Sequence, residues 1–203
     1  MGEAVVEVTA GSGTKLHSWS KTVGANTVHD EFTLPGEYPL ASYSILASSI
    51  SVATVDDHLL AIQAGSSLNV RIRRIRVEQD ASATAAATLA LTVLRLTTAG
   101  SGGTSVTPRP YDTTDSAAGC TARTLNSTKG TESVELLHPL MVLRQTVATA
   151  GAQFDDFWEW SQMPNQKPII IPSGTANGIA IKTLNGRAGA SVVIQVEVVE
   201  TAF

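Results

Sequence analysis

The sequence predicts an all-β protein, an antiparallel β-sandwich of jelly-roll type with an extended N-terminal arm. Three observations lead to this fold class. Between Val192 and Val198 every second residue is apolar and most of the others are polar, which is the period-two pattern of a half-buried strand. The segment 167–200 holds three apolar runs, and the Asn-Gly pairs at 177–178 and 185–186 predict tight reversals that join them as a meander. Residues that favour helices, such as Glu and Lys, are scarce.

The composition narrows the classes of function. The chain has 203 residues, enough for one well-filled core. Only 16% of them are charged, below the usual quarter or so, which predicts a surface that is unusually neutral or covered by neighbours. A net charge of −4 gives no bulk attraction to nucleic acid or to an anionic membrane. The single cysteine, Cys120, cannot form an internal disulfide and favours assembly in a reducing cytosol. No apolar run is long enough to predict a membrane span.

Residues 1–60 are the least regular third of the chain and are expected to form an N-terminal arm and early strands. They contain more aromatic residues than a free linker would carry. We therefore expect this region to be ordered and to form an interface, with Trp19, Phe32 and Tyr38 as candidate contact residues. The β-sandwich domain is expected to occupy residues 61–203.

The first strong strand is predicted at 68–79, where the apolar residues change parity. Val70 and Ile72 would lie on one face and Ile75 on the other, so the inward face switches near Arg73. A β-bulge there would restore the register, because it inserts one extra residue into one strand.

Further along, the run 88–97 is apolar on both parities, which predicts a bulged strand or a central strand buried on both faces. The segment 99–119 is a long irregular loop, and such loops are uncommon in compact domains unless they are used. A strand is favoured over a helix at 132–145, and Pro139 should bend it or place it at a sheet edge.

No metal or nucleophile motif emerges from the sequence. Asp56, Asp57 and His58 could offer two carboxylates and an imidazole, but neighbours on a strand point to opposite faces. A solvated cluster at a strand end is the favoured interpretation. Cys120 has no base that the sequence identifies, and no GxSxG elbow is present.

A group of acidic and aromatic residues is similar to those in clefts that bind or cleave sugars: Asp155, Asp156, Trp158, Glu159 and Trp160. On a strand the two tryptophans would share one face. Trp is valued mainly for its large buried area, so packing in a core or an interface is favoured over stacking on a ligand.

Four arginines form the one dense basic cluster, at Arg71, Arg73, Arg74 and Arg76. Nucleic-acid binding would require interleaved aromatic residues and a basic domain, and the sequence provides neither. Salt bridges between subunits are the favoured role, because the planar guanidinium pairs bidentately with carboxylates.

The order of the segments 67–79, 88–97 and 167–200 resembles that of phage capsid decoration (cement) proteins of β-sandwich or jelly-roll type. The resemblance implies a non-enzymatic virion structural protein, assembled in the host cytoplasm. Its implied partners are the major capsid protein and copies of itself as a homotrimer, with no cofactor, metal, membrane or direct nucleic-acid contact. No catalytic residues are carried over.

Two other functions remain open from the residues alone. A carbohydrate- or receptor-binding module of a phage tail or fibre would use Trp158, Trp160 and the 99–119 loop, although a glycan is the less favoured partner. A glycan hydrolase or lyase would use the acids beside those tryptophans, but an enzyme is not the function that we expect.

Overall fold

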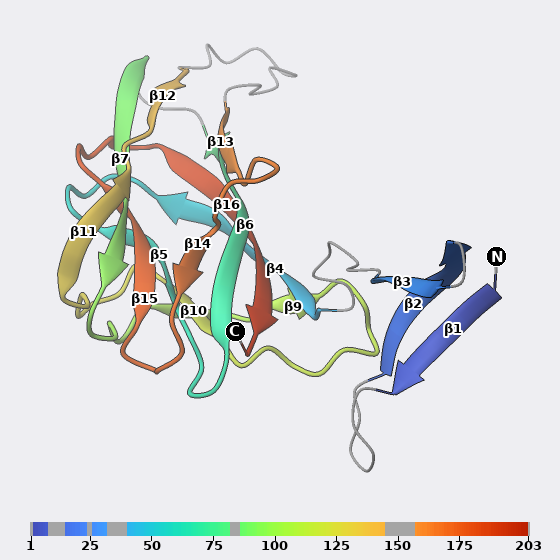
Figure 1. Ribbon diagram of the computed structural model, residues 1–203. Coiled ribbons are helices and arrows are strands. Elements are labelled where there is room, and N and C mark those ends of the chain that lie inside the picture. The colour runs from blue at the N-terminus through green and yellow to red at the C-terminus, as the bar shows by residue number, and fades with distance from the viewer. Residues whose placement is uncertain are drawn as a thin grey trace. The chain divides into compact units, whose positions relative to one another are not determined.

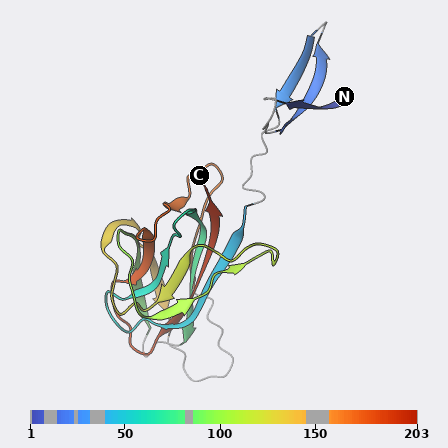
Figure 2. The same ribbon diagram turned by 90° about the horizontal axis from the view of Figure 1, so that it is seen from below.

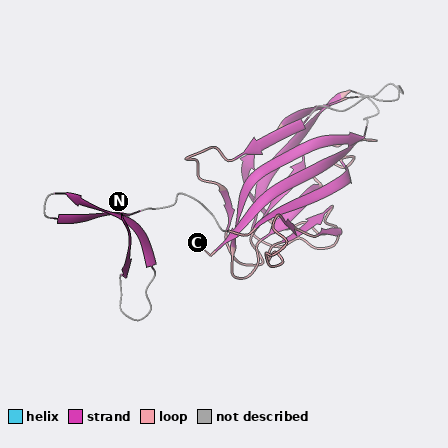
Figure 3. Cartoon of the chain, turned by 90° about the vertical axis from the view of Figure 1, so that its right-hand side faces the viewer, coloured by secondary structure: helices cyan, strands magenta, loops and turns pink. Residues whose placement is uncertain are grey.

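The computed structural model describes residues 2–7, 15–23, 26–31, 40–81, 86–144 and 157–202. Every regular element in these ranges is a β-strand (Figure 3). The chain divides into two compact units, Met1–Pro39 and Leu40–Phe203.

The first unit contains a small antiparallel sheet with the order β1-β2-β3 (Figure 2). Its strands are β1 (Gly2–Glu7), β2 (Lys15–Val23) and β3 (Asn26–Glu31). Trp19 lies in β2, in register with Glu3 and Asp30. Phe32 and Tyr38 fall outside the described residues. The described backbone therefore forms a sheet in the region where the sequence predicts an arm with early strands.

The second unit is a sandwich of two antiparallel sheets (Figure 1), which confirms the predicted fold class. The six-stranded sheet has the order β13-β6-β16-β4-β9, and β14 also pairs with β6. Its strands are β4 (Ser42–Ser51), β6 (Asn69–Ala81), β9 (Arg109–Pro110), β13 (Phe157–Ser161), β14 (Ile169–Ile171) and β16 (Ser191–Thr201).

The seven-stranded sheet has the order β11-β7-β15-β5-β10-β8, and β12 also pairs with β7. Its strands are β5 (His58–Gln63), β7 (Ala87–Leu96), β8 (Thr104–Val106), β10 (Thr121–Thr124), β11 (Glu132–Leu137), β12 (Leu140–Leu143) and β15 (Gly178–Thr183).

The sandwich begins earlier in the chain than residue 61, the predicted start of the domain. β4 pairs with β16 along most of its length, and Tyr43 and Ile45 from β4 are fully buried in the core. A boundary at residue 60 would cut through β5. The sequence signal was weak here because the runs of Ser in β4 hide its apolar alternation.

The core lies between the two sheets and consists mainly of Ile, Leu and Val. The long strands β4, β6 and β16 of the six-stranded sheet contribute alternate residues, as the pattern in β16 shows: Val192, Ile194, Val196 and Val198 are all buried. This confirms the alternation predicted for that strand.

The predicted β-bulge is present at Arg73. Glu197 of β16 is in register with Arg74, and the next residue, Val198, is in register with Ile72, so Arg73 is the extra residue. Ile72 and Ile75 are consequently both fully buried although their parities differ. At the other edge of β6, β14 pairs with the residues that precede Arg73, and β13 pairs with the residues that follow it.

The prediction for residues 88–97 is also confirmed, because β7 is buried on both faces. Leu91 and Val93 belong to the main core, whereas Leu94 and Leu96 form a second buried cluster with alanines of β5 and β15. Beside β7, Pro139 separates β11 from β12, and both of these strands pair at this edge of the sheet. The expectation that Pro139 would bend the strand or place it at a sheet edge therefore agrees with the structure.

The closing strands do not form the predicted meander. β14 and β16 belong to the six-stranded sheet, whereas β15 lies between β7 and β5 in the other sheet, so the chain crosses between the layers twice. The positive φ angles expected at the two Asn-Gly pairs occur instead at Gly174 (118°) and Gly189 (75°).

The asparagines of these pairs act through their side chains. Asn177 Nδ2 donates to Ser173 O at 2.9 Å, and Asn185 Oδ1 accepts from the Ala90 N–H at 2.7 Å. Gly and Asn occur at connections between sheets as well as in hairpins. The Asn-Gly pairs alone therefore do not distinguish a meander from a chain that crosses between the sheets.

Candidate functional site

Two sheet edges that face each other form a concave surface on the sandwich. β9 pairs with β4 only at Tyr43 and Ser44, so within the described part of the chain the rest of β4 has no strand on that side. Among the described strands, β8 pairs with β10 alone. Edge strands present unpaired backbone N–H and C=O groups, which are a template for another extended chain.

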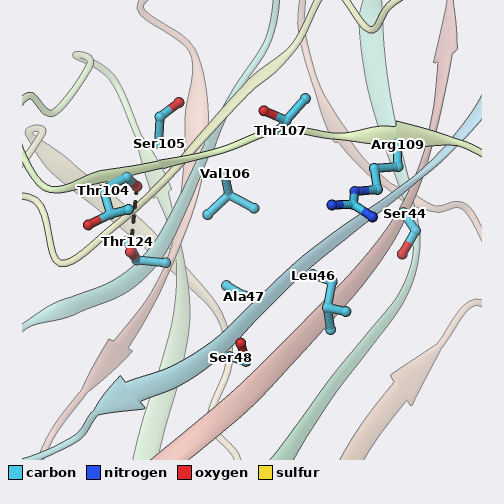
Figure 4. A pocket seen from close by; sticks show the side chains of 10 residues that line it. All are labelled: Ser44, Leu46, Ala47, Ser48, Thr104, Ser105, Val106, Thr107, Arg109 and Thr124. Atoms are coloured by element: carbon cyan, nitrogen blue, oxygen red, sulfur yellow. Dashed lines mark hydrogen bonds between the residues drawn. The ribbon is translucent and has the colours of Figure 1, made fainter.

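The space between these edges, which we call the edge groove, has a volume of about 490 Å³. It is lined by Ser44, Leu46, Ala47, Ser48, Thr104, Ser105, Val106, Thr107, Arg109 and Thr124. Figure 4 shows Ser44 and Arg109 at one end of the groove and Thr104 with Thr124 at the other. Thr124 Oγ1 donates to Thr104 O at 3.5 Å, which ties β10 to β8 at that end.

The edge groove is nearly uncharged. Arg109 is the one charged side chain among the lining residues, and the others carry hydroxyl groups or are apolar. The side chain of Leu46 on β4 is 57% exposed, and a leucine this exposed is unusual at an open sheet edge. β4 also contains a bulge next to the groove, where Ser49 adopts a positive φ of 55°. The groove can therefore receive an extended, weakly charged segment, and the bulge limits how far a new strand can pair.

Two of the four predicted interface arginines have acidic partners in the same chain. Arg74 donates to Glu159 at 2.7 Å and to Glu197 at 3.2 Å, which raises its pKa, mainly through the bond to Glu159. Arg76 pairs with Glu78 at 3.3 Å and lies over the Phe157 ring, 4.3 Å from its centroid. Arg71 and Arg73 also make interactions. Arg74 and Arg76 therefore have acidic partners within the chain, and salt bridges between subunits stay a prediction.

Trp158 and Trp160 point into the sandwich. They are in register with Val77 and Ile75 of β6, and both pack against the main core. Packing in the core, the interpretation favoured from the sequence, therefore agrees with their position. Glu159 lies on the opposite face of the same strand, where Arg74 holds it, while Asp155 and Asp156 fall outside the described residues.

The strand-end cluster at Asp56, Asp57 and His58 has two members that sequence reasoning missed. His58 is fully buried, and its Nε2 lies 2.9 Å from Glu132 Oε1. Lys182 Nζ donates to Glu132 Oε2 at 2.9 Å and lies 3.1 Å from Asp56 Oδ1. The cluster thus alternates anions and cations. Within the described ranges no group of three or more His, Cys, Asp or Glu is placed to hold a metal ion.

The ionisation of this cluster is set by its internal hydrogen bonds. Burial would raise the pKa of Glu132, but the bonds from Lys182 and His58 outweigh it and leave the pKa below its ordinary value. Burial would likewise lower the pKa of Lys182, and the bonds to Glu132 and Asp56 reverse that effect and raise it. Both groups are therefore held in their charged forms at neutral pH.

Cys120 is buried, directly before β10. The backbone N–H groups of Gly119 and Cys120 donate to the Glu200 carboxylate at 2.9 and 2.6 Å. Burial, with the nearby Glu200 charge, raises the pKa of the Cys120 thiol. A buried thiol with a raised pKa is a poor nucleophile, so Cys120 is a core residue.

Compared with known protein families, with curated proteins and with solved structures, the chain matches none of them. The part of the chain that the structure describes contains no helix that could span a lipid bilayer.

Proposed function

We propose that this protein is a non-enzymatic structural protein that assembles through its β-sandwich, as a decoration or cement protein of a phage capsid. Its partners would be the major capsid protein and other copies of the chain, as a homotrimer, in a virion assembled in the host cytoplasm. The capsid and the trimer come from the family resemblance of the sequence. The edge groove is the structural observation that supports assembly.

The edge groove supports this proposal because its rim lacks the residues that usually protect an open sheet edge. Natural sheets protect long open edges with charged residues or proline, and β4 has neither between Ser44 and Ser51. An extended segment of a neighbour could pair with this edge, while its side chains contact Leu46 and the hydroxyl groups of β8. A weakly charged groove suits such a contact, since burying unpaired charge is costly.

A substitution at the edge tests the proposal. Leu46→Lys places a charge on the rim of the edge groove, and we expect it to reduce self-association and binding to capsid shells at least tenfold while the circular dichroism spectrum is unchanged. Val142→Lys is the matched control, because Val142 is also 57% exposed and lies on the edge strand β12 of the other sheet. The measurements are mass by light scattering and co-sedimentation with shells. A wild-type chain that stays monomeric and binds no shell would overturn the proposal.

The first unit is tested separately by removal of Met1–Pro39, which leaves a unit with its own core. Following the expectation that this region forms an interface, the shortened chain should fold and lose binding to its partner. Unchanged binding would assign the interface to the sandwich alone.

The alternative, a carbohydrate- or receptor-binding module, would use Trp158 and Trp160 as an aromatic surface. Both are half-buried and pack against the core, which leaves less of each indole for stacking on a sugar. Glycan binding through these tryptophans is therefore not the function that we favour.

A further inference from the structure

A second concave surface lies in the seven-stranded sheet and its loops. We call it the glycine-lined cleft. It has a volume of about 540 Å³ and is formed by residues 63–66, the loop 99–102, the first part of β10 and Thr175. Four of its lining residues are glycines, at positions 65, 100, 102 and 119. The glycines at 65, 100 and 102 let the loops of the cleft pack closely on one another, because a Cβ there would meet Gly119, Asn126 and Ser127 respectively.

One cation lies in this cleft, and it has no acidic partner. Arg123 pairs with no carboxylate in the described part of the chain, and its Nη1 makes one long bond, 3.4 Å, to Gly102 O. A guanidinium carries five N–H donors in a fixed fork, so most of the donors of Arg123 remain for a ligand. This differs from Arg74, which two glutamates hold.

A buried amide beside Arg123 also lacks a partner. Gln63 is only 7% exposed, and its Nε2 has no hydrogen-bond partner, although its Oε1 accepts a long bond of 3.4 Å from Thr121 Oγ1. Native proteins pair nearly all buried polar atoms, because an unmade hydrogen bond is costly. Gln63 is one of the residues that line the cleft, and the terminal torsion of Gln rotates broadly, so a ligand in the cleft would be able to accept from this donor.

The remaining lining residues indicate the class of ligand. Ser66, Ser101, Thr121 and Thr175 supply hydroxyl groups, and none of the described residues that line the cleft is aromatic. Any sugar bound here would therefore be held by hydrogen bonds and not by stacking, and a neutral sugar would gain nothing from the guanidinium charge. A carboxylate would take the guanidinium and the amide, since charge-assisted hydrogen bonds are about twice as strong as neutral ones.

Glu200 lies behind Gly119, but its carboxylate already accepts two backbone N–H groups. These bonds stabilise the charge but do not remove it, so Glu200 opposes an anion at the Gly119 end of the cleft, and a ligand carboxylate is expected at Arg123 instead. We propose that the glycine-lined cleft binds an acidic saccharide unit, with Arg123 and Gln63 holding the carboxylate and the Ser and Thr hydroxyls pairing with the sugar hydroxyls.

The test is a titration of the full chain followed by NMR, with glucuronate, glucose and acetate as probes. Glucuronate should shift the Gln63 side-chain amide and the backbone amides of Gly100 and Gly102, and should bind at least tenfold more tightly than glucose or acetate. Arg123→Gln should weaken glucuronate binding about 10–100-fold, the loss of one charge-assisted bond pair. Lys167→Gln, which removes an exposed cation outside both concave surfaces, is the matched control and should bind like the wild type.

Each other outcome counts against the proposal. Equal binding of acetate and glucuronate would overturn the saccharide assignment and leave a simple anion site. Glucuronate shifts that are the same in Arg123→Gln and in the wild type would overturn the site itself. The inference is independent of capsid assembly, because a monomer that binds glucuronate would refute the proposed function and support the cleft.

Discussion

The outer faces of the two sheets differ in how far their charged side chains are exposed to solvent. On the six-stranded sheet, Arg74 lies between Glu159 and Glu197, and all three side chains are about one-third exposed. On the seven-stranded sheet, His58 is fully buried and Lys182 is 13% exposed, and both bind Glu132. The first face is a solvated ladder of ion pairs, whereas on the second the basic groups are buried or nearly so and their acidic partner Glu132 is 33% exposed.

This difference predicts on which face substitutions will lower the stability of the protein. Leu94 and Leu96 are buried on the outer side of the seven-stranded sheet, whereas Leu46 is exposed on the outer side of the other. Water screens charges that are exposed, and it screens buried ones much less. Substitutions on the seven-stranded sheet should therefore cost stability, and those on the six-stranded sheet should change contacts with solvent or partners.

The largest effect is expected from a matched pair of leucines. Leu94→Ala should lower the free energy of unfolding by about 3 kcal/mol, because it removes buried methyl groups and leaves a cavity. Leu46→Ala should change it by less than about 0.5 kcal/mol, because that side chain is already exposed. Urea unfolding followed by circular dichroism measures both. Equal losses would mean that the two faces are equally buried in solution.

An intermediate effect is expected at Glu132. Glu132→Gln leaves Lys182 with one carboxylate and weakens the bond to buried His58, so stability at neutral pH should fall by about 1–3 kcal/mol. Glu159→Gln, in the solvated ladder, is the control and should cost less than about 1 kcal/mol.

The pH dependence of Glu132 sharpens this prediction. Because the pKa of Glu132 is lower in the folded protein, its contribution is complete above the ordinary value of 4.5 and is lost as the pH falls through the folded value. The wild type should therefore lose stability in acid more steeply than Glu132→Gln. Urea midpoints between about pH 7 and pH 3 measure the slopes, and identical slopes would contradict the assignment.

The smallest effect is expected at Arg74. Arg74→Gln should cost at most about 1 kcal/mol, because exposed ion pairs gain little over hydration. The difference from the wild type should shrink in about 1 M NaCl, where charges are screened within roughly 3 Å. Unfolding at low and high salt tests this. A large loss that salt does not change would place Arg74 in a buried network like that of Glu132.

Features that depend on neighbouring residues were predictable from the sequence. The bulge at Arg73 follows from the change of parity between Ile72 and Ile75, and the double burial of β7 follows from apolar residues on both parities. Both signals lie within a dozen residues, and strand geometry converts them directly into structure.

Features that depend on distant residues were not predictable. His58 and Glu132 are 74 positions apart, and no local pattern links them. The closing strands were assigned correctly but paired wrongly, because a strand's partner is decided by the whole sheet. The edge groove was missed for the same reason, since it is defined by where β9 and β8 stop pairing.

The bulge at Arg73 has a practical consequence for engineering. The chain leaves the sheet after β13 at Gln162, whose N–H donates to Arg73 O, and returns at β14 beyond a turn closed by the bond from Gln166 N to Met163 O. Met163 at the tip is 69% exposed. A peptide inserted at this turn would break no bond between paired strands, so the excursion is a natural display position for an epitope or a tag.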